Sequence, residues 1–579
     1  MNKRDELIQS YKTGCLLDAV HANLSAERND SSILSLELVA LHNERLIDVV
    51  EAFESLKNNS TSNPNFFLTR HVFEKALPNL NAPILSVMRC VLHLYREAGE
   101  DLAAGTIIDG FIAFCEKDPS RPHEALMAIE ASPGEFANLL TATLSTGARI
   151  DHPLYLSETL RLCEDKNIEL RRRAISSLGQ LNWPAGIGLP DSVFDTLEGS
   201  SERETDDQIL ANIIRTTFAL SQRATDQESR AIALITSVLA KGDEYALHAA
   251  SELFGFHTDK LTTSFLDVLF KQLLRVKTTN KGTLDNIDYG ISNLLKKDNP
   301  DKVIRFLEDL LLAHPQKLTM DAFDSSIRAV LNNKALISKV LTRWFMRGDR
   351  ILCEGVHTII RTHYGKALPL EIDPSELKPS DLVHILFVAR KTIGYLFIQP
   401  ISAASILISL MRQTTDDKVL AELSKLLFDP LLLNFTGKVR DYLIQQSDIE
   451  SGKLKAAIGN ALKAIDDYLK DLRSVGNLAA LHPGETQREA YHRHFSRLMT
   501  ESYKEAEAKS VFLNLVSKSV LLYGRKSINY VYDLDRKPNR METELQSFGT
   551  EIEIPRMENI DPFGLDYMLR IFRNEQFRI

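Results

Sequence analysis

The sequence predicts an all-α protein, in which a long array of stacked helix pairs is followed by a small α+β module at the C-terminal end. Apolar residues recur at helical spacing in nearly every window, and short polar or Gly/Pro breaks separate the windows. No sustained period-two alternation occurs before about residue 520. Aromatic residues make up 7% of the 579 residues, so Leu, Ala, Ile and Ser fill most apolar and small positions, as is typical of helices.

Composition and charge narrow the class of protein further. The chain is 44% hydrophobic and 25% charged, which excludes disordered, collagen-like and fibrous proteins. A net charge of −9 argues against a chain that as a whole neutralises a nucleic-acid backbone. The five cysteines are far apart and form no C-x-x-C pair, so we expect neither a disulfide framework nor a metal site.

The sequence gives no sign of export or of membrane insertion. The first residues, MNKRDELIQS, are charged and lack the apolar core of a secretory signal. The longest uncharged stretch, residues 392–411, could span a bilayer by its length, but Gln399 and Pro400 interrupt it. We expect this stretch to hold the end of one buried helix and the start of the next, in a cytoplasmic protein with no membrane partner.

Turn-forming clusters divide the chain into three predicted segments. Residues 1–57 are expected to form an N-terminal helical cap, residues 58–482 the repeat array and residues 483–579 the C-terminal module. The polar clusters at 58–65 (NNSTSNPN) and 477–486 (NLAALHPGET) mark the two boundaries. The segment 183–190 (WPAGIGLP), with two prolines and two glycines, is a candidate hinge inside the array.

One stretch of the array carries a specific pattern. Residues 165–181 (DKNIELRRRAISSLGQL) contain an acidic turn, an aliphatic–Arg pair, an Ala three residues later and a Leu-Gly pair. Leu170, Ala174 and Leu178 fall on one helical stripe, where the small Ala allows a partner helix to come close. This stretch resembles the second helix of a HEAT repeat, which implies a HEAT/ARM-like solenoid. The resemblance also implies that Asp165 and Arg171 belong to a structural ladder between repeats.

The resemblance is weaker elsewhere in the array. Residues 243–255 keep Ala246, Ala250 and Gly255 but have Leu247 where the Arg belongs. Residues 348–360 and 416–430 keep little beyond an acidic turn and an aliphatic stripe. We therefore expect degenerate repeats.

The C-terminal module begins as a basic block and ends as an acidic tail. From Arg488 to Arg540 there are 11 Lys or Arg against 6 Asp or Glu, and beyond Arg540 there are 4 against 8. A helix is expected from about residue 487 to residue 522, followed by extended segments at 527–533 and 550–555. Asp561 as N-cap and Pro562 start a last helix. Its apolar face comprises Leu565, Met568, Leu569 and Phe572.

Catalytic motifs are nearly absent from the sequence. The chain has no phosphate-binding glycine loop, nucleophile elbow, H-E-x-x-H motif or EF-hand loop, so we expect no cofactor. One enzymatic candidate is the pair Arg488 and His494, whose spacing resembles that of the helical HEPN ribonucleases. In that family the pair contacts a phosphate and handles a proton. The alternative is a solvated amphipathic helix.

Basic residues and tyrosines alternate after this helix and could neutralise phosphates and stack on bases. The candidate nucleic-acid-binding residues are Tyr523, Arg525, Lys526, Tyr530, Arg536, Lys537 and Arg540. Asp533 and Asp535 weaken the positive field, and the same residues would also suit a cap that covers the last repeat.

From these features we expect a non-enzymatic scaffold that binds a protein partner as a subunit or adaptor of an intracellular complex. The alternative is a nucleic-acid-binding protein of a bacterial repair or antiviral-defence complex, which would act through the basic C-terminal module. A HEPN-like ribonuclease is a further alternative. The sequence leaves the oligomeric state open.

Overall fold

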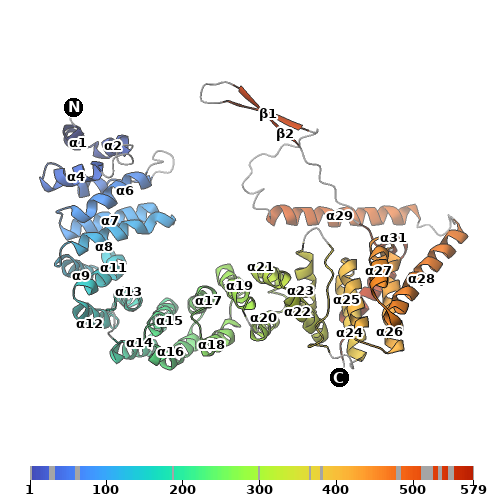
Figure 1. Cartoon of the computed structure of the whole chain (residues 1–579). Helices are drawn as coiled ribbons and strands as arrows, with labels where there is room; N and C mark the ends of the chain where they lie inside the picture. The colour runs from blue at the N-terminus through green and yellow to red at the C-terminus, as the bar shows by residue number, and fades with distance from the viewer. Residues whose placement is uncertain are drawn as a thin grey trace. The chain divides into compact units, whose positions relative to one another are not determined.

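The computed structural model describes residues 3–24, 33–58, 66–184, 188–297, 300–363, 367–377, 382–476, 484–509, 526–532, 538–544 and 553–577. These residues are almost entirely helical, with one two-stranded hairpin (Figure 1). Their contacts divide the chain into two compact units. The first holds residues 1–318 and 322–326, and the second holds residues 319–321 and 327–579. This division does not coincide with the boundaries predicted at residues 57 and 482.

The first unit is a series of short helices. In chain order they are α1 (Lys3–Lys12), α2 (Leu16–Ala22), α4 (Ile33–Asn43), α5 (Val49–Phe53), α6 (Phe66–Ala76), α7 (Ile84–Ala98), α8 (Thr106–Glu116), α9 (Arg121–Ala131), α10 (Pro133–Phe136), α11 (Leu140–Ile150), α12 (His152–Leu162), α13 (Ile168–Leu178), α14 (Asp191–Arg203), α15 (Asp207–Ser221), α16 (Glu228–Lys241), α17 (Glu244–Phe256), α18 (Thr263–Leu273), α19 (Lys281–Leu295) and α20 (Asp301–Ala313).

Helices of the first unit stack in two rows. In one row α13 packs on α15, α15 on α17 and α17 on α19, while in the other α14 packs on α16 and α16 on α18. Chain neighbours such as α15 and α16 join the rows. Each helix pair therefore buries its apolar residues against the next pair, so the core runs along the stack instead of gathering at one centre.

Glycines bring α17 and α19 into close contact. A Cβ atom on Gly255 would lie 2.8 Å from the carbonyl oxygen of Asn286, and one on Gly290 would lie 2.7 Å from the carbonyl oxygen of Phe254. Real Cβ atoms do not approach a backbone oxygen so closely, because the atoms would overlap. The spacing of these two helices thus depends on the absence of side chains at Gly255 and Gly290.

The candidate hinge at residues 183–190 interrupts neither row. Its residues 185–187 lie outside the described part of the chain. Trp183 is buried, its indole Nε1 donates a hydrogen bond of 3.3 Å to the carbonyl oxygen of Leu178, and its ring meets that of His152 edge-on. Because α13 and α15 pack together across this segment, the stack continues through it.

Between α20 and residue 509 the described chain is mostly helical, although residues 367–377 form no helix. The helices are α21 (Asp324–Leu331), α22 (Lys334–Arg347), α23 (Arg350–Arg361), α24 (Leu382–Leu396), α25 (Pro400–Arg412), α26 (Asp417–Leu426), a π-helix (Leu427–Leu432), α27 (Lys438–Ile449), α28 (Gly452–Val475) and α29 (Glu485–Lys509). The break predicted at Pro400 is confirmed, since α24 ends at Leu396 and Pro400 opens α25. No described helix is long and apolar enough to cross a membrane.

A hairpin and two helices complete the second unit. Strand β1 (Lys526–Tyr532) pairs antiparallel with β2 (Pro538–Glu544), so that Tyr530 lies opposite Arg540. Strand β1 lies where the first extended segment was predicted, at 527–533, whereas β2 was not predicted. Of the second predicted segment, 550–555, residues 550–552 lie outside the described part, and residues 553–555 form no strand. The last helices are α31 (Met557–Ile560) and α32 (Pro562–Asn574). Asp561 caps α32 as predicted, since its carboxylate accepts a hydrogen bond of 2.9 Å from the amide of Gly564.

The glycine contact between α17 and α19 leads to a first prediction. Gly255→Ala should destabilise the first unit by about 1–3 kcal/mol, because the added methyl group forces the helices apart. Gly199→Ala in α14 is the matched control: no atom lies within 4 Å of its Cβ position. The control should raise stability by about 0.5–1 kcal/mol through helix propensity. Thermal unfolding followed by circular dichroism measures both, and an equal effect of the two substitutions would contradict the close packing.

Candidate functional site

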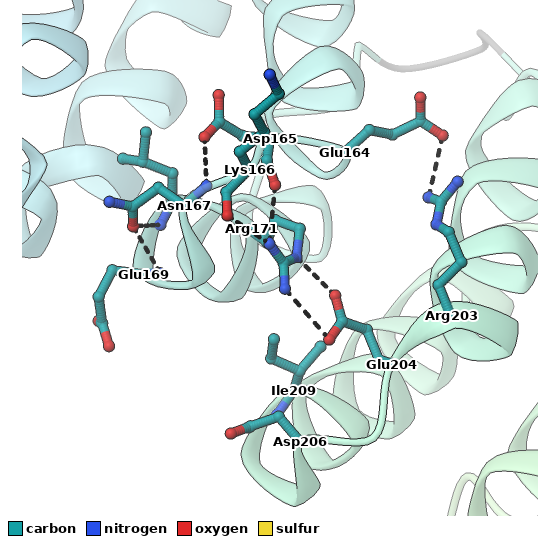
Figure 2. A network of polar contacts seen from close by, with 11 residues as sticks. Glu164, Asp165, Lys166, Asn167, Glu169, Arg171, Arg203, Glu204, Asp206 and Ile209 are labelled. Carbon is teal, nitrogen blue, oxygen red and sulfur yellow. Dashed lines mark hydrogen bonds and ion pairs between the residues drawn. The ribbon is translucent and has the colours of Figure 1, made fainter.

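The residues predicted to form a structural ladder lie in the first unit, around the start of α13 (Figure 2). The guanidinium of Arg171 donates to Glu204 at 2.6 Å and to the carbonyl oxygens of Asp165 and Lys166 at 2.9 and 3.0 Å. The carboxylate of Asp165 instead accepts a hydrogen bond of 2.7 Å from the amide of Asn167. Asp165 therefore meets Arg171 through its backbone, and Glu204, before α15, supplies the acid.

Similar ion pairs between neighbouring helix pairs recur along the first unit. Arg215 pairs with Glu252 at 2.6 Å and Arg230 with Glu198 at 2.7 Å. In a set of seven such pairs the partners are 31 to 39 residues apart, whereas Arg89 and Glu135 are 46 residues apart. The set comprises Arg149–Glu116, Arg161–Glu130, Arg171–Glu204, Arg203–Glu164, Arg215–Glu252, Arg230–Glu198 and Lys302–Asp267. Because this separation is close to the length of one helix pair, each ion pair joins one helix pair to the next.

The two HEPN-like candidates lie on α29, where Arg488 and His494 are both exposed. Six residues on a helix correspond to about 9 Å along the axis and about 120° around it. The two side chains therefore do not share a face of α29. Among the described residues no hydrogen bond joins them, so α29 alone does not assemble the pair.

The candidate nucleic-acid-binding residues are only partly described. Tyr523, Arg525, Arg536 and Lys537 lie outside the described residues. The register of the hairpin puts Lys526, Tyr530 and Arg540 at positions of one face.

Acidic residues occupy the same face of the hairpin. Glu544 is the register partner of Lys526, and Glu542 forms an ion pair with Arg540. The described positions of this face therefore carry two basic and two acidic residues and have no net positive charge.

The chain after the hairpin is held first beside α27. The carboxylate of Glu553 accepts hydrogen bonds of 2.9 and 3.2 Å from the amides of Gly437 and Lys438. It thereby caps α27, whose own N-cap residue, Gly437, has no side chain. Buried Asn434 accepts a hydrogen bond of 2.8 Å from the amide of Met557 through its side chain.

The same segment is held a second time where α32 packs on α24. Gly394 permits the close contact, because a Cβ atom there would lie 3.1 Å from the backbone nitrogen of Arg573. Arg573 Nε donates to the carbonyl oxygen of Gly394 at 2.5 Å, and Arg390 forms a bidentate pair with Glu575 at 2.7 and 2.6 Å. We call this set of contacts, from Glu553 to Glu575, the C-terminal clasp.

A buried lysine completes the clasp. Lys391 is fully buried, and its ammonium donates a hydrogen bond of 2.7 Å to the carbonyl oxygen of Arg573. It also lies 5.3 Å from the centroid of the Phe387 ring and 6.0 Å from that of Tyr395. Burial lowers the pKa of Lys391, because the charged form loses water. The carbonyl at the end of α32 partly offsets that cost.

The clasp displays an apolar face of α32. Leu565 and Leu569 are buried, whereas Phe563, Tyr567 and Ile571 are 84%, 68% and 50% exposed. At spacings of four residues, these three side chains form one stripe along the helix, which we call the outer row. An α-helix with apolar residues on two sides can bury both only between two partners, and α24 covers one side.

A second exposed apolar stripe lies on α29. Tyr491, Phe495 and Met499 follow one another at four-residue spacing, and the rings of Tyr491 and Phe495 stack with centroids 6.3 Å apart. Every α29 residue with a described burial is exposed except Tyr491. Partial burial, and then the Glu558 carboxylate, raise the pKa of Tyr491.

Neither a metal site among the described residues nor a similar protein indicates a reaction for this region. Among the described residues, no group of three His, Cys, Asp or Glu could hold a metal ion. Comparison with protein-family models, curated proteins and solved structures found no match to the chain. The sequence reasoning missed the outer row, although the run Phe563, Tyr567 and Ile571 beside Leu565 and Leu569 was a readable sign of a helix with two apolar sides.

The ladder leads to a second prediction. Arg171→Gln should destabilise the first unit by about 1–2 kcal/mol, because the largely buried Glu204 loses its partner. Arg203→Gln, which breaks the exposed pair with Glu164 in the same view (Figure 2), should change stability by less than about 0.5 kcal/mol. A double-mutant cycle with Glu204→Gln in thermal unfolding measures the coupling. Zero coupling between Arg171 and Glu204 would count against the ladder.

The clasp leads to a third prediction. Asn434→Ala should speed hydrogen–deuterium exchange in residues 557–574 by about tenfold, because the amide of Met557 loses its acceptor in a buried setting. Asn574→Ala removes only a local bond to the carbonyl of Arg570 and serves as the control. Unchanged exchange of α32 in the Asn434 variant would show that Asn434 does not hold the clasp.

Proposed function

We propose that this protein is a non-enzymatic scaffold of degenerate HEAT-like repeats that binds a protein partner through the outer row of its C-terminal clasp. The repeat interpretation is supported by the two rows of alternating helices in the first unit and by ion pairs that recur at separations of 31 to 39 residues. Stacks of this kind suit large partners, because they offer long surfaces.

The outer row is the observation that carries the proposal. Phe563, Tyr567 and Ile571 stay exposed on a helix that is firmly held on its other side by Lys391 and the Arg390–Glu575 pair. Exposed apolar stripes on well-anchored helices are typical of protein-binding sites, where aromatic side chains contribute much of the affinity. A partner with an apolar groove or helix face would bury this stripe.

Two other partners have less support. A membrane surface would meet the acidic residues Glu558 and Asp561 near the outer row, which anionic lipids repel, while Asp566 is paired with Arg570 and adds no net positive charge. Nucleic acid would meet the hairpin, where Glu542 and Glu544 balance Arg540 and Lys526. The ribonuclease alternative requires Arg488 and His494 to act from different sides of α29.

A site-specific crosslinking experiment tests the proposal. A photoreactive phenylalanine analogue at position 567 of the full chain, expressed in its native host, should form a protein–protein crosslink of defined mass. The triple variant Phe563→Ser, Ile571→Ser with Tyr567 replaced by the analogue should lose most of that product, because the apolar stripe is gone. Mass spectrometry identifies the crosslinked protein.

Exposed apolar residues of the first unit provide the control. In the control variant the analogue replaces Tyr245, and Met127→Ser removes a second exposed apolar side chain. Both residues are more than half exposed, so the variant tests whether any exposed apolar position gives the same product. Equal crosslinking at 245 and 567 would contradict a specific site. A complex that nuclease treatment or added salt dissolves would favour the nucleic-acid alternative instead.

A further inference from the structure

An exposed ion pair lies beside the outer row of α32. Asp566 and Arg570 pair at 2.8 Å, with 69% and 52% of their side-chain surface open to solvent. Helix geometry places them about 100° and about 60° around the axis from Tyr567, in the same direction. They therefore form one charged flank of the outer row, while α24 covers the opposite side of α32.

The order of the charges along α32 is self-complementary. When two copies of a helix lie antiparallel across a twofold axis, the same flank of each faces the other. A residue a given number of positions before the axis is then level with the residue that number of positions after it. With the axis at the level of Met568, Asp566 of each copy is level with Arg570 of the other. Unlike charges meet in this register, and no like charges are level.

The same position of the axis interleaves the two apolar rows. Residues of a helix rise by about 1.5 Å each, so outer-row side chains four positions apart are about 6 Å apart along α32. Around Met568, the side chains of one row fall midway between those of the other, about 3 Å along the axis from each neighbour. Ridges of residues four apart pack in this way, each in the groove of the other helix. One register thus suits both the apolar row and its charged flank.

We infer that the protein partner of the outer row is a second copy of this chain, bound through an antiparallel pair of α32 helices. The second copy rests on the proposed function, because it occupies the surface that the proposed function uses. Phe563 and Tyr567 together expose roughly 300 Å². With Ile571 and the charged flank, two copies bury on the order of 1,000 Å², which is the low end for specific interfaces. The dimer is therefore reversible and forms at micromolar concentrations.

Charge exchange between two variants of the full chain tests this partner. Asp566→Arg leaves two bases on the flank and Arg570→Asp leaves two acids, so each variant alone should dimerise at least about tenfold more weakly than the wild type. An equal mixture of the two should recover a heterodimer of about wild-type affinity, because unlike charges are again level. Sedimentation velocity between about 1 and 100 µM measures the three affinities.

Glu354→Arg is the matched control. Glu354 forms a pair of the same spacing with Arg350 on α23, at 2.7 Å and also exposed, away from the outer row in sequence. This variant should leave the dimer affinity unchanged. Since the unfolding temperature of each variant is measured first, a variant that fails to fold is replaced by Asp566→Lys or Arg570→Glu.

Three results would overturn the second copy as partner: a wild-type chain that stays monomeric, a dimer that neither charge variant weakens, or a mixture that does not recover affinity. Each is distinguishable from failure of the proposed function. A monomeric chain that crosslinks from position 567 to a different protein keeps the outer row as a protein-binding site and excludes the second copy. A crosslinked product with the mass of one chain also excludes it, because a segment of the same chain then covers the row.

Discussion

The close stacking of alternate helices is the constraint on which the first unit depends. A single pair of short helices such as α17 and α18 leaves one apolar side open, so its stability comes from the pairs before and after it. At Gly255 and Gly290 the backbones come so near that a methyl group would meet a carbonyl oxygen. Ion pairs such as Arg215–Glu252 then join neighbouring helix pairs, and because both side chains are partly exposed they contribute little to stability.

The same reasoning explains how far the sequence could predict this fold. Helical periodicity and the break at Pro400 are local signals, and the structure has helices and a break at those places. The ladder was visible only near residue 171, where an acidic turn, Arg and Ala stand together. Arg215 and Arg230 have acids 37 and 32 residues away, and a separation that varies along the stack is not a recognisable motif in a single sequence.

The C-terminal clasp lay beyond sequence reasoning for a different physical reason. The start of α32 was predictable, because Asp561 and Pro562 form a local cap. Its docking place was not, because 182 residues separate Lys391 from the carbonyl of Arg573 that it binds. From the sequence alone, a lysine in an apolar run such as Lys391 is expected to extend its ammonium to solvent. It is buried instead, because the packed α32 provides an acceptor for its ammonium.

The clasp also does more than fasten the end of the chain. The contacts that hold α32 lie on the side that faces α24 or at its C-terminal end. They are the buried Leu565 and Leu569, the Arg390–Glu575 pair and the Lys391 hydrogen bond. Polar side chains at 563, 567 and 571 would leave these contacts intact and would improve solubility, because the outer side of a fastening helix gains nothing from exposed aromatic surface. The exposed Phe563 therefore has no role in the attachment of α32. Its apolar surface is in contact with water, and a partner that covers it would lower the free energy of the protein.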